Sequence, residues 1–226
     1  MLTNLIRQSK SLDSATPEEI VLWAKYIFSP KIVVSSSFQN QSMPLLHMIS
    51  RCAPEIIVLF IDTGFHFPET IAFRDQIVDH FNLNIEIVKP DKSKQEFLSE
   101  NGELYLRQPD ACCQLNKTLP FQKAIAGQSA WISGIRRDQT TNRAEIPIIS
   151  QHPFLPLFKI APLAGWTSKD VEAYIKMHDL PTHPLNLQGY QSIGCLPCTT
   201  PVTANEDERA GRWRGIDKEE CGIHFP

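Results

Sequence analysis

The sequence lacks several features that define other classes of protein. No uninterrupted apolar run approaches the roughly 20 residues that a helix needs to span a bilayer, and the first residues lack the apolar core of a signal peptide. Basic residues are not in excess, since 22 Lys and Arg stand against 25 Asp and Glu, a net charge of −3. A general nucleic-acid-binding protein would normally be basic. We therefore expect a cytoplasmic protein whose partners include neither a membrane nor a nucleic acid.

Strand-like apolar segments alternate with segments of helical periodicity along most of the chain. Strands are expected at 31–34, 56–61, 84–88 and 130–133, and helices at 17–28, 43–50, 68–81, 115–126 and 168–178. This order predicts an α/β fold, with a mainly parallel sheet and helices on both faces. After Leu180 prolines and glycines interrupt any periodicity. We expect residues 1–180 to form the α/β domain and residues 181–226 to form a loop-rich C-terminal tail of the same domain.

Polar residues follow three of the expected strands, at Ser35–Ser37, Asp62–Gly64 and Gly134–Arg137. Ligands of parallel sheets bind beyond the carboxyl ends of the strands. These three segments are therefore expected to share one ligand-binding rim.

The spacing of the six cysteines indicates a metal or redox site. Cys112 and Cys113 are adjacent, and Cys195 and Cys198 form a C-x-x-C pair, which is a frequent metal-ligand spacing. Four thiolates suit zinc or an iron–sulfur cluster. Adjacent cysteines fit poorly around one small ion but can reach different corners of a cluster, which favours the cluster. Buried packing of the adjacent pair as small apolar side chains is the alternative.

Cys221 stands near the end of the chain, with Lys218 and His224 close by. Nearby positive charge stabilises a thiolate, which is the nucleophilic form of cysteine. The alternative is that Cys221 is an incidental surface cysteine near a frayed terminus. The position of Cys221 in the sequence does not decide between these two interpretations.

Five motifs occur together in this chain. They are CCQLNK (112–117), SGIRRDQTTNR (133–143), GYQSIGCLPCT (189–199), NEDERAGRW (205–213) and KEECGIH (218–224). From about Lys31 to the end, the chain resembles the assimilatory sulfonucleotide reductases, which reduce adenylyl sulfate or its 3′-phosphorylated form to sulfite. The resemblance implies an adenine nucleotide α-hydrolase-like fold, with residues 1–180 as the nucleotide-binding domain.

The resemblance also implies a cofactor and a substrate. The paired cysteines are similar to those of the branch that carries a 4Fe–4S cluster, which implies Cys112, Cys113, Cys195 and Cys198 as its ligands. That branch uses adenylyl sulfate, so we expect thioredoxin-dependent reduction of this nucleotide to sulfite and AMP. The 3′-phosphorylated nucleotide, or both nucleotides, is the alternative substrate.

By the same resemblance, Cys221 is the catalytic residue. Its thiolate would attack the sulfur of the substrate's sulfate group and form S-sulfocysteine. Reduced thioredoxin or glutaredoxin would then release sulfite. The implied substrate-binding residues are Ser35, Ser37, Asp62, Thr63, Lys117, Gly134, Arg136, Arg143, Arg209, Arg212 and His224. The chain departs from the family pattern at Phe38–Gln41, where many members have Gly-Ala-Glu-Asp, and at Asn116, where a basic residue is frequent.

Two other classes of function are possible. A non-enzymatic iron–sulfur sensor on a nucleotide-binding scaffold would need the four cluster cysteines but not Cys221. An enzyme that activates its substrate with ATP would need a Ser-Gly-Gly-x-Asp-Ser type of loop after the first strand, and the stretch after Val34 lacks those glycines.

Overall fold

The computed structural model describes residues 12–218, 220 and 222–224. Cys221, the predicted nucleophile, lies outside the described residues. Within the described residues, no helix combines the length and the apolar character that crossing a membrane requires.

A six-stranded sheet forms the centre of the molecule, with the strand order β3-β2-β1-β4-β6-β5. The strands are β1 (Ile32–Ser35), β2 (Ile57–Ile61), β3 (Ile85–Val88), β4 (Ala130–Ser133), β5 (Ile149–Gln151) and β6 (Phe158–Ile160). All neighbouring strands run parallel except the edge strand β5, which is antiparallel to β6. The prediction of a mainly parallel sheet is confirmed.

The helices are joined to the strands by short loops and 3₁₀ turns. The α-helices are α2 (Pro17–Phe28), α3 (Met43–Cys52), α4 (Pro68–Phe81), α5 (Lys94–Asn101), α6 (Leu104–Arg107), α7 (Pro109–Cys113), α8 (Leu119–Ile125) and α9 (Ser168–Met177). The 3₁₀ turns are η1 (Leu12–Ser14), η2 (Asn40–Ser42), η4 (Arg137–Gln139), η5 (Thr141–Arg143), η6 (Pro184–Gln188) and η7 (Leu196–Cys198). At the start of α2, the Thr16 side chain accepts from the Glu19 backbone and Glu19 bonds back, as a capping box requires.

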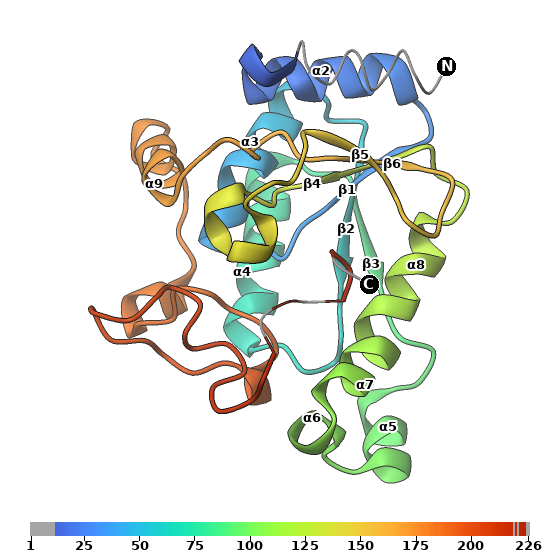
Figure 1. Cartoon of the computed structure of the whole chain (residues 1–226), viewed down its shortest axis with the longest axis vertical. Helices are drawn as coiled ribbons and strands as arrows, with labels where there is room; N and C mark the ends of the chain where they lie inside the picture. Colours follow the sequence, from blue (N-terminus) through green and yellow to red (C-terminus); the bar gives the residue numbers. More distant parts are fainter. Residues whose placement is uncertain (1–11, 219, 221, 225–226) are drawn as a thin grey trace.

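Both faces of the sheet are covered, because alternate strand residues point to opposite sides. Val34 and Phe60 belong to a core that includes residues of α2, α3 and α4. Val33 and Leu59 belong to a second core that includes residues of α8. Figure 1 shows α3 and α4 on one side of the strands and α8 on the other. Helices on both faces were predicted, and this is confirmed.

The helix expected at 115–126 is broken at its beginning. Residues Gln114–Thr118 form a π-helical turn, η3, between α7 and α8. Pro120 lies in the first turn of α8 and has no N–H to donate, and the Leu119 amide instead reaches back to the Gln114 carbonyl. π-turns inside helices occur frequently at functional sites. Here the turn joins the adjacent cysteines to Lys117.

The C-terminal region has little regular structure. In the described part of residues 181–224, only η6 and η7 are regular elements, and isolated bridges join His66 to Cys195 and Thr199 to Arg212. In Figure 1 this region, orange to red, lies across the lower left and then returns towards the strands.

Candidate active site

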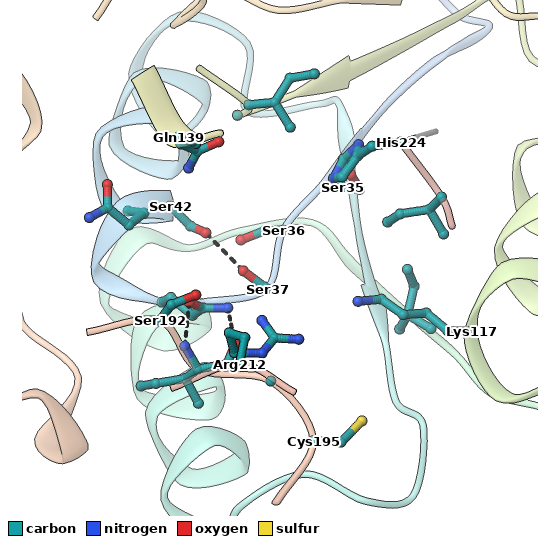
Figure 2. A pocket seen from close by; sticks show the side chains of 18 of the residues that line it. Ser35, Ser36, Ser37, Ser42, Lys117, Gln139, Ser192, Cys195, Arg212 and His224 are labelled. Atoms are coloured by element: carbon teal, nitrogen blue, oxygen red, sulfur yellow. Dashed lines mark hydrogen bonds between the residues drawn. The ribbon is translucent and has the colours of Figure 1, made fainter. Parts of the chain in front are cut away.

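A cleft opens at the carboxyl ends of β1, β2 and β4. Ser36, Ser37, Thr63 and Gly134, which follow or end these strands, line it. Figure 2 shows the Ser36 and Ser37 side chains in the middle of this cleft. The expected rim at the strand ends is therefore present.

The loop after β1 ties this rim to the C-terminal region. Phe38 is fully buried with a φ of +52°, which turns the chain sharply. The Gln39 amide then holds Ile193, accepting from its backbone N–H at 2.8 Å and donating to its carbonyl. Gln41 donates to the Glu208 carboxylate at 2.9 Å. The stretch that departs from the family pattern thus holds two parts of the C-terminal region against the sheet.

Besides Arg143, three cationic side chains line the cleft from different directions: Lys117 after α7, and Arg209 and Arg212 from the C-terminal region. Figure 2 shows Lys117 and Arg212 reaching towards the open centre from separate sides. The Arg212 guanidinium lies 4.3 Å from the centroid of the Trp213 ring. It also passes Gly194 so closely that a Cβ there would lie 2.4 Å from a guanidinium nitrogen. Arg212 can hold this position only because residue 194 has no side chain.

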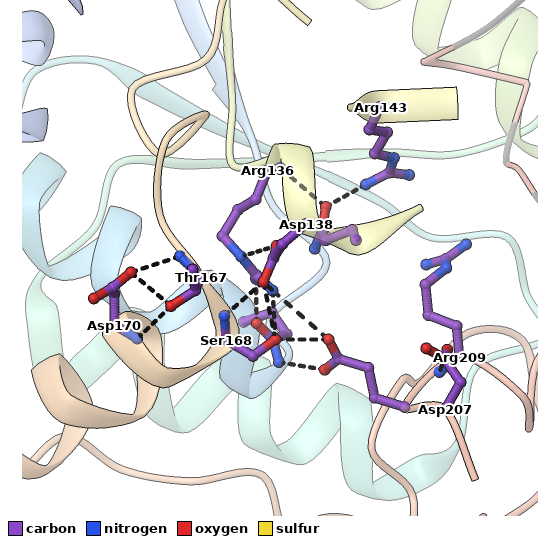
Figure 3. A network of polar contacts seen from close by, with 11 residues as sticks. Arg136, Asp138, Arg143, Thr167, Ser168, Asp170, Asp207 and Arg209 are labelled. Atoms are coloured by element: carbon purple, nitrogen blue, oxygen red, sulfur yellow. Dashed lines mark hydrogen bonds and ion pairs between the residues drawn. The ribbon is translucent and has the colours of Figure 1, made fainter. Parts of the chain in front are cut away.

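Arg136 is wholly buried and does not line the cleft. Its guanidinium donates to Asp138 at 2.9 Å, to the Ser168 hydroxyl at 2.9 Å and to Gln41, and it lies 3.7 Å from Glu208. Figure 3 shows this network at the beginning of α9. Arg136 was expected to contact substrate, but its guanidinium is engaged in holding loops together.

Arg143 lines the cleft, but a carboxylate of the chain itself engages its guanidinium. Its Nε and Nη2 atoms donate to Glu220 at 2.9 and 2.5 Å, and Nη1 donates to Gln139. Thr140 donates to the same carboxylate at 2.6 Å, and Arg209 lies 4.0 Å away. Burial alone would raise the pKa of Glu220, but the hydrogen bonds from Arg143 and Thr140 outweigh it and lower the pKa. Glu220 is therefore ionised.

Ile223 and His224 pack near Trp131, on β4. The His224 ring stacks on the indole at 5.5 Å with an interplanar angle of 9°, and Ile223 is buried in the same core. Lys159 donates to the His224 carbonyl at 3.3 Å, and the Trp131 N–H donates to the Ser35 hydroxyl at 2.8 Å. Burial and the nearby cations hold the pKa of His224 well below its usual range, so its ring is neutral. Figure 2 shows His224 beside Ser35 at the edge of the cleft.

Four cysteines surround a second, smaller cavity that adjoins the cleft. Its lining residues are Thr63, Phe65, Tyr105, Pro109, Cys112, Cys113, Asn116, Lys117, Cys195, Pro197 and Cys198. Burial, together with the other three thiols, raises the pKa of Cys112 to about 12, and similar causes raise that of Cys198 to about 11. No group of three or more His, Cys, Asp or Glu side chains among the described residues is arranged to hold a single metal ion.

Thr63 connects the cleft and this cavity, because it lines both. Its hydroxyl lies 3.2 Å from the Cys195 sulfur and accepts from a backbone N–H at 3.3 Å. Asp62 does not line the cleft; its carboxylate accepts from the Gly64 amide at 3.0 Å and closes the turn after β2. Gly64 has a φ of +76°, which this turn requires.

The structure brings most of the predicted substrate residues together. Those that line the cleft are Ser35, Ser37, Thr63, Lys117, Gly134, Arg143, Arg209, Arg212 and His224. Sequence reasoning missed Gln39, Gln41, Glu208 and Glu220. Glu208 and Glu220 lie within the motifs, but an acidic residue is not expected beside an anionic ligand. The two glutamines lie in the loop 38–41, which differs from the family pattern, and this difference is the sequence feature that could have drawn attention to them.

Comparison with known proteins agrees with this geometry. Residues 31–201 match the model of the phosphoadenosine phosphosulfate reductase domain. The adenosine 5′-phosphosulfate reductase of Streptomyces coelicolor is 40% identical over 96% of this chain and 92% of its own length. That of Staphylococcus haemolyticus is 42% identical over 96% and 90%. A phosphoadenosine 5′-phosphosulfate reductase of Gloeobacter violaceus is 41% identical over 98% and 94%.

Solved structures extend the likeness to the fold. The phosphoadenylyl-sulfate reductase of Candida auris, in a phosphate complex, superposes with a TM-score of 0.78 at 29% identity, covering 88% of this chain and 98% of that one. The FMN adenylyltransferase of Candida glabrata shares the fold at 16% identity, with a TM-score of 0.61 over 95% and 76% of the two chains. The fold is thus of the adenine nucleotide α-hydrolase-like type that the motifs predicted. From the match over most of its length, the chain belongs to the phosphoadenosine phosphosulfate reductase domain family.

Proposed function

We propose that this protein reduces adenylyl sulfate to sulfite and AMP in sulfate assimilation, with Cys221 as the nucleophile. The observation that carries the proposal is the meeting of two sets of residues in one cleft. Hydroxyls and turns at the strand ends suit a nucleotide. Ile223 and His224, which follow Cys221 in sequence, line the same cleft, and Glu220, which precedes it, is bonded to the cleft-lining Arg143. The relatives from Streptomyces and Staphylococcus bear the name of this activity.

In the first step, the Cys221 thiolate would attack the sulfur of the sulfate group. An S–S bond forms, the bond from that sulfur to the phosphate oxygen breaks, and AMP leaves with the electron pair. The charge that develops on the leaving phosphate needs fixed cations nearby. Lys117, Arg209 and Arg212 line the cleft and would supply these charges. Guanidinium groups suit phosphate and sulfate oxygens in particular.

In the second step, a thiolate of reduced thioredoxin or glutaredoxin would attack the Cys221 sulfur. Sulfite leaves with the electrons of the S–S bond, and the mixed disulfide is resolved by the partner's second thiol. The dithiol of the reductant is oxidised and the sulfur of the substrate is reduced, so the electrons balance.

The four clustered cysteines are proposed to hold a 4Fe–4S cluster. The cavity that they surround is largely apolar, and burial keeps Cys112 and Cys198 protonated in the absence of a compensating cation. A set of four thiols in such a place fits a cationic iron–sulfur core, which would allow them to ionise. When bound, the cluster would supply structural order and a local electrostatic field. Lys117 lines both the cysteine cavity and the cleft.

The proposal also covers the role of the C-terminal residues and the cellular compartment of the protein. We propose that residues 181–226 extend the 1–180 nucleotide-binding domain and carry the C-x-x-C ligands and the catalytic cysteine. The protein is proposed to act in the cytoplasm, where thiol reductants are available.

The alternative substrate is the 3′-phosphorylated nucleotide, or both nucleotides. It is favoured by the Gloeobacter relative, which is 41% identical and named for that substrate. Steady-state turnover of each nucleotide with the same reductant separates the candidates, and better turnover of the 3′-phosphorylated form would favour the alternative.

The decisive experiment is mass spectrometry of the iron-loaded protein after incubation with adenylyl sulfate and no reductant. A sulfite-sized adduct on Cys221, absent from the Cys221→Ser variant, is expected. An unmodified Cys221 under these conditions would contradict the proposal and favour a non-enzymatic iron–sulfur protein. Iron and acid-labile sulfide analysis of the anaerobically purified protein tests the cluster, and zinc without sulfide would refute it.

A further inference from the structure

Glu220 is the residue next to Cys221, and its carboxylate accepts three hydrogen bonds from Arg143 and Thr140. Its side chain is 9% exposed, and that of its partner Arg143 is 5% exposed. Two nitrogens of one guanidinium and the hydroxyl of Thr140 converge on the two carboxylate oxygens. Bidentate pairs of this kind fix orientation as well as charge.

Arg143 and Glu220 are 77 residues apart in sequence, so the pair fixes a distant segment to the cleft. Arg143 lies in η5, beyond the end of β4, and Gln139 holds its remaining nitrogen. Thr140 immediately precedes η5. A rigid turn of the domain therefore presents both partners of Glu220.

The other contacts of residues 218–224 fix the backbone less firmly. Ile223 is buried by apolar packing, His224 stacks on Trp131 at 5.5 Å and its carbonyl accepts one hydrogen bond from Lys159 at 3.3 Å, and Lys218 forms a single ion pair with Asp110. Packing, stacking and single contacts made by a flexible lysine allow a segment to slide and rotate, whereas two parallel hydrogen bonds do not. The Glu220 pair is thus the bidentate contact among these, one residue before Cys221.

We propose that Glu220 is a positioning residue for the proposed nucleophile, because its ion pair with Arg143 fixes the backbone one residue before Cys221. The cleft remains open beside the bound tail, with the strand-end serines and Lys117 lining it. Substrate therefore does not need to displace Glu220. This inference rests on the proposed role of Cys221 as nucleophile.

The test compares Glu220→Ala and Glu220→Gln with the full-length, iron-loaded wild type. Removal of the anchor should lower kcat by about tenfold or more, because the nucleophile is no longer aligned, and leave KM within about twofold. Gln keeps the shape but loses the charge, so its kcat should lie between those of Ala and the wild type. Glu220→Asp should restore part of kcat.

A second readout does not depend on turnover. The indole N–H signal of Trp131 in an NMR spectrum of the substrate-free protein senses the stacked His224 ring, and His224→Ala gives the signal without that ring. Glu220→Ala should move the signal towards that of His224→Ala. Glu206→Gln, which removes an exposed pair with Arg214 in the same region, is the matched control and should change neither readout.

Two results would overturn the inference. In one, Glu220→Ala keeps the wild-type Trp131 signal and the wild-type kcat. In the other, the variants lower KM with kcat unchanged, which would mean that Glu220 competes with the substrate for Arg143. Failure of the proposed function is a different result, namely no adduct on Cys221 of the wild type, and leaves the NMR comparison readable.

Discussion

The two sides of the cleft are built in different ways. The strand-end rim, formed by Ser35–Ser37, Thr63 and Gly134, follows directly from a hydrogen-bonded parallel sheet. The C-terminal segment, residues 181–224, has only short 3₁₀ turns in its described part and is held by side chains such as Gln39 and Arg143. Backbone ladders are cooperative and survive single side-chain changes, whereas a segment held by individual ion pairs and side-chain hydrogen bonds does not. Substitutions should therefore affect the two sides separately.

The largest effect is expected from loss of one proposed cluster ligand. Cys112→Ser should reduce bound iron from about four atoms per chain to nearly none, since a hydroxyl is a poor ligand for iron–sulfur clusters. Two of the four proposed ligands, Cys195 and Cys198, lie in the C-terminal segment, so this segment should become sensitive to trypsin while the sheet retains its circular dichroism. Iron analysis and timed proteolysis measure both.

Cys52, which is neither a proposed cluster ligand nor the proposed nucleophile, gives the control for this experiment. Cys52 ends α3 and is absent from the lining of the cysteine cavity. Cys52→Ser should keep its iron and its resistance to trypsin. Equal loss of iron in both variants would mean that the cavity is not the cluster site.

A substitution of Arg136 tests the network that connects the sheet side of the cleft to Glu208 in the C-terminal segment. Arg136→Met leaves Asp138 and Glu208 without their buried partner, and breaking such a pair costs about 3 kcal/mol. The melting temperature of the iron-loaded protein should fall by roughly 6–12 °C. Arg214→Met, which breaks an exposed pair, should change it by less than about 3 °C. A small change in both would mean that the network contributes little to stability.

Gly194 tests the C-terminal segment alone. A methyl group at this position would displace the Arg212 guanidinium, which approaches to 2.4 Å of the Cβ position. If Arg212 binds the anionic part of the substrate, Gly194→Ala should lower kcat/KM about 30-fold, the equivalent of roughly 2 kcal/mol for a lost charged hydrogen bond. Arg212→Ala should have the same effect, and the double variant should be no worse. Additive losses would mean that Gly194 acts in another way.

The same contrast explains what the sequence could predict. The strands β1, β2 and β4 and the helices α2 and α4 follow from apolar periodicity and capping residues, which are local signals. The edge strand β5 and its neighbour β6 have three residues each, which is too short a pattern to recognise. The break at η3 depends on a single proline within a helical pattern.

For the site, motifs named the cleft-lining residues but not what each one contacts. Arg136 and Arg143 lie in the same motif, yet one is buried in a structural network and the other holds Glu220. Both assignments depend on partners at least 32 positions away, Ser168 and Glu220. Pairings of that range come from the tertiary fold, and a single sequence does not contain them.

The smallest expected effect is a pH dependence confined to the tail. His224 is neutral when packed on Trp131, because burial and the charges of Lys159 and Arg143 lower its pKa well below 6.5. In an undocked tail it would titrate near 6.5, so the undocked state binds more protons below that pH. Docking should therefore weaken as the pH falls below about 6.5, by up to about 1.4 kcal/mol, or tenfold, per pH unit, until the lowered pKa is reached. Glu220 stays ionised in this window because its own pKa is lowered, so the pair with Arg143 persists.

The Trp131 indole signal, followed from pH 8 down to about pH 5.5, measures this loss. His224→Gln removes the titrating group, and its signal should vary much less over the same range. The strand-end rim is the internal reference, since amide signals of β1 and β2 should not follow the same curve. If rim and tail signals move together, protonation loosens the whole domain, and the tail has no separate docking equilibrium. If only the tail signals move, the two sides of the cleft are independent in acid, as their different construction requires.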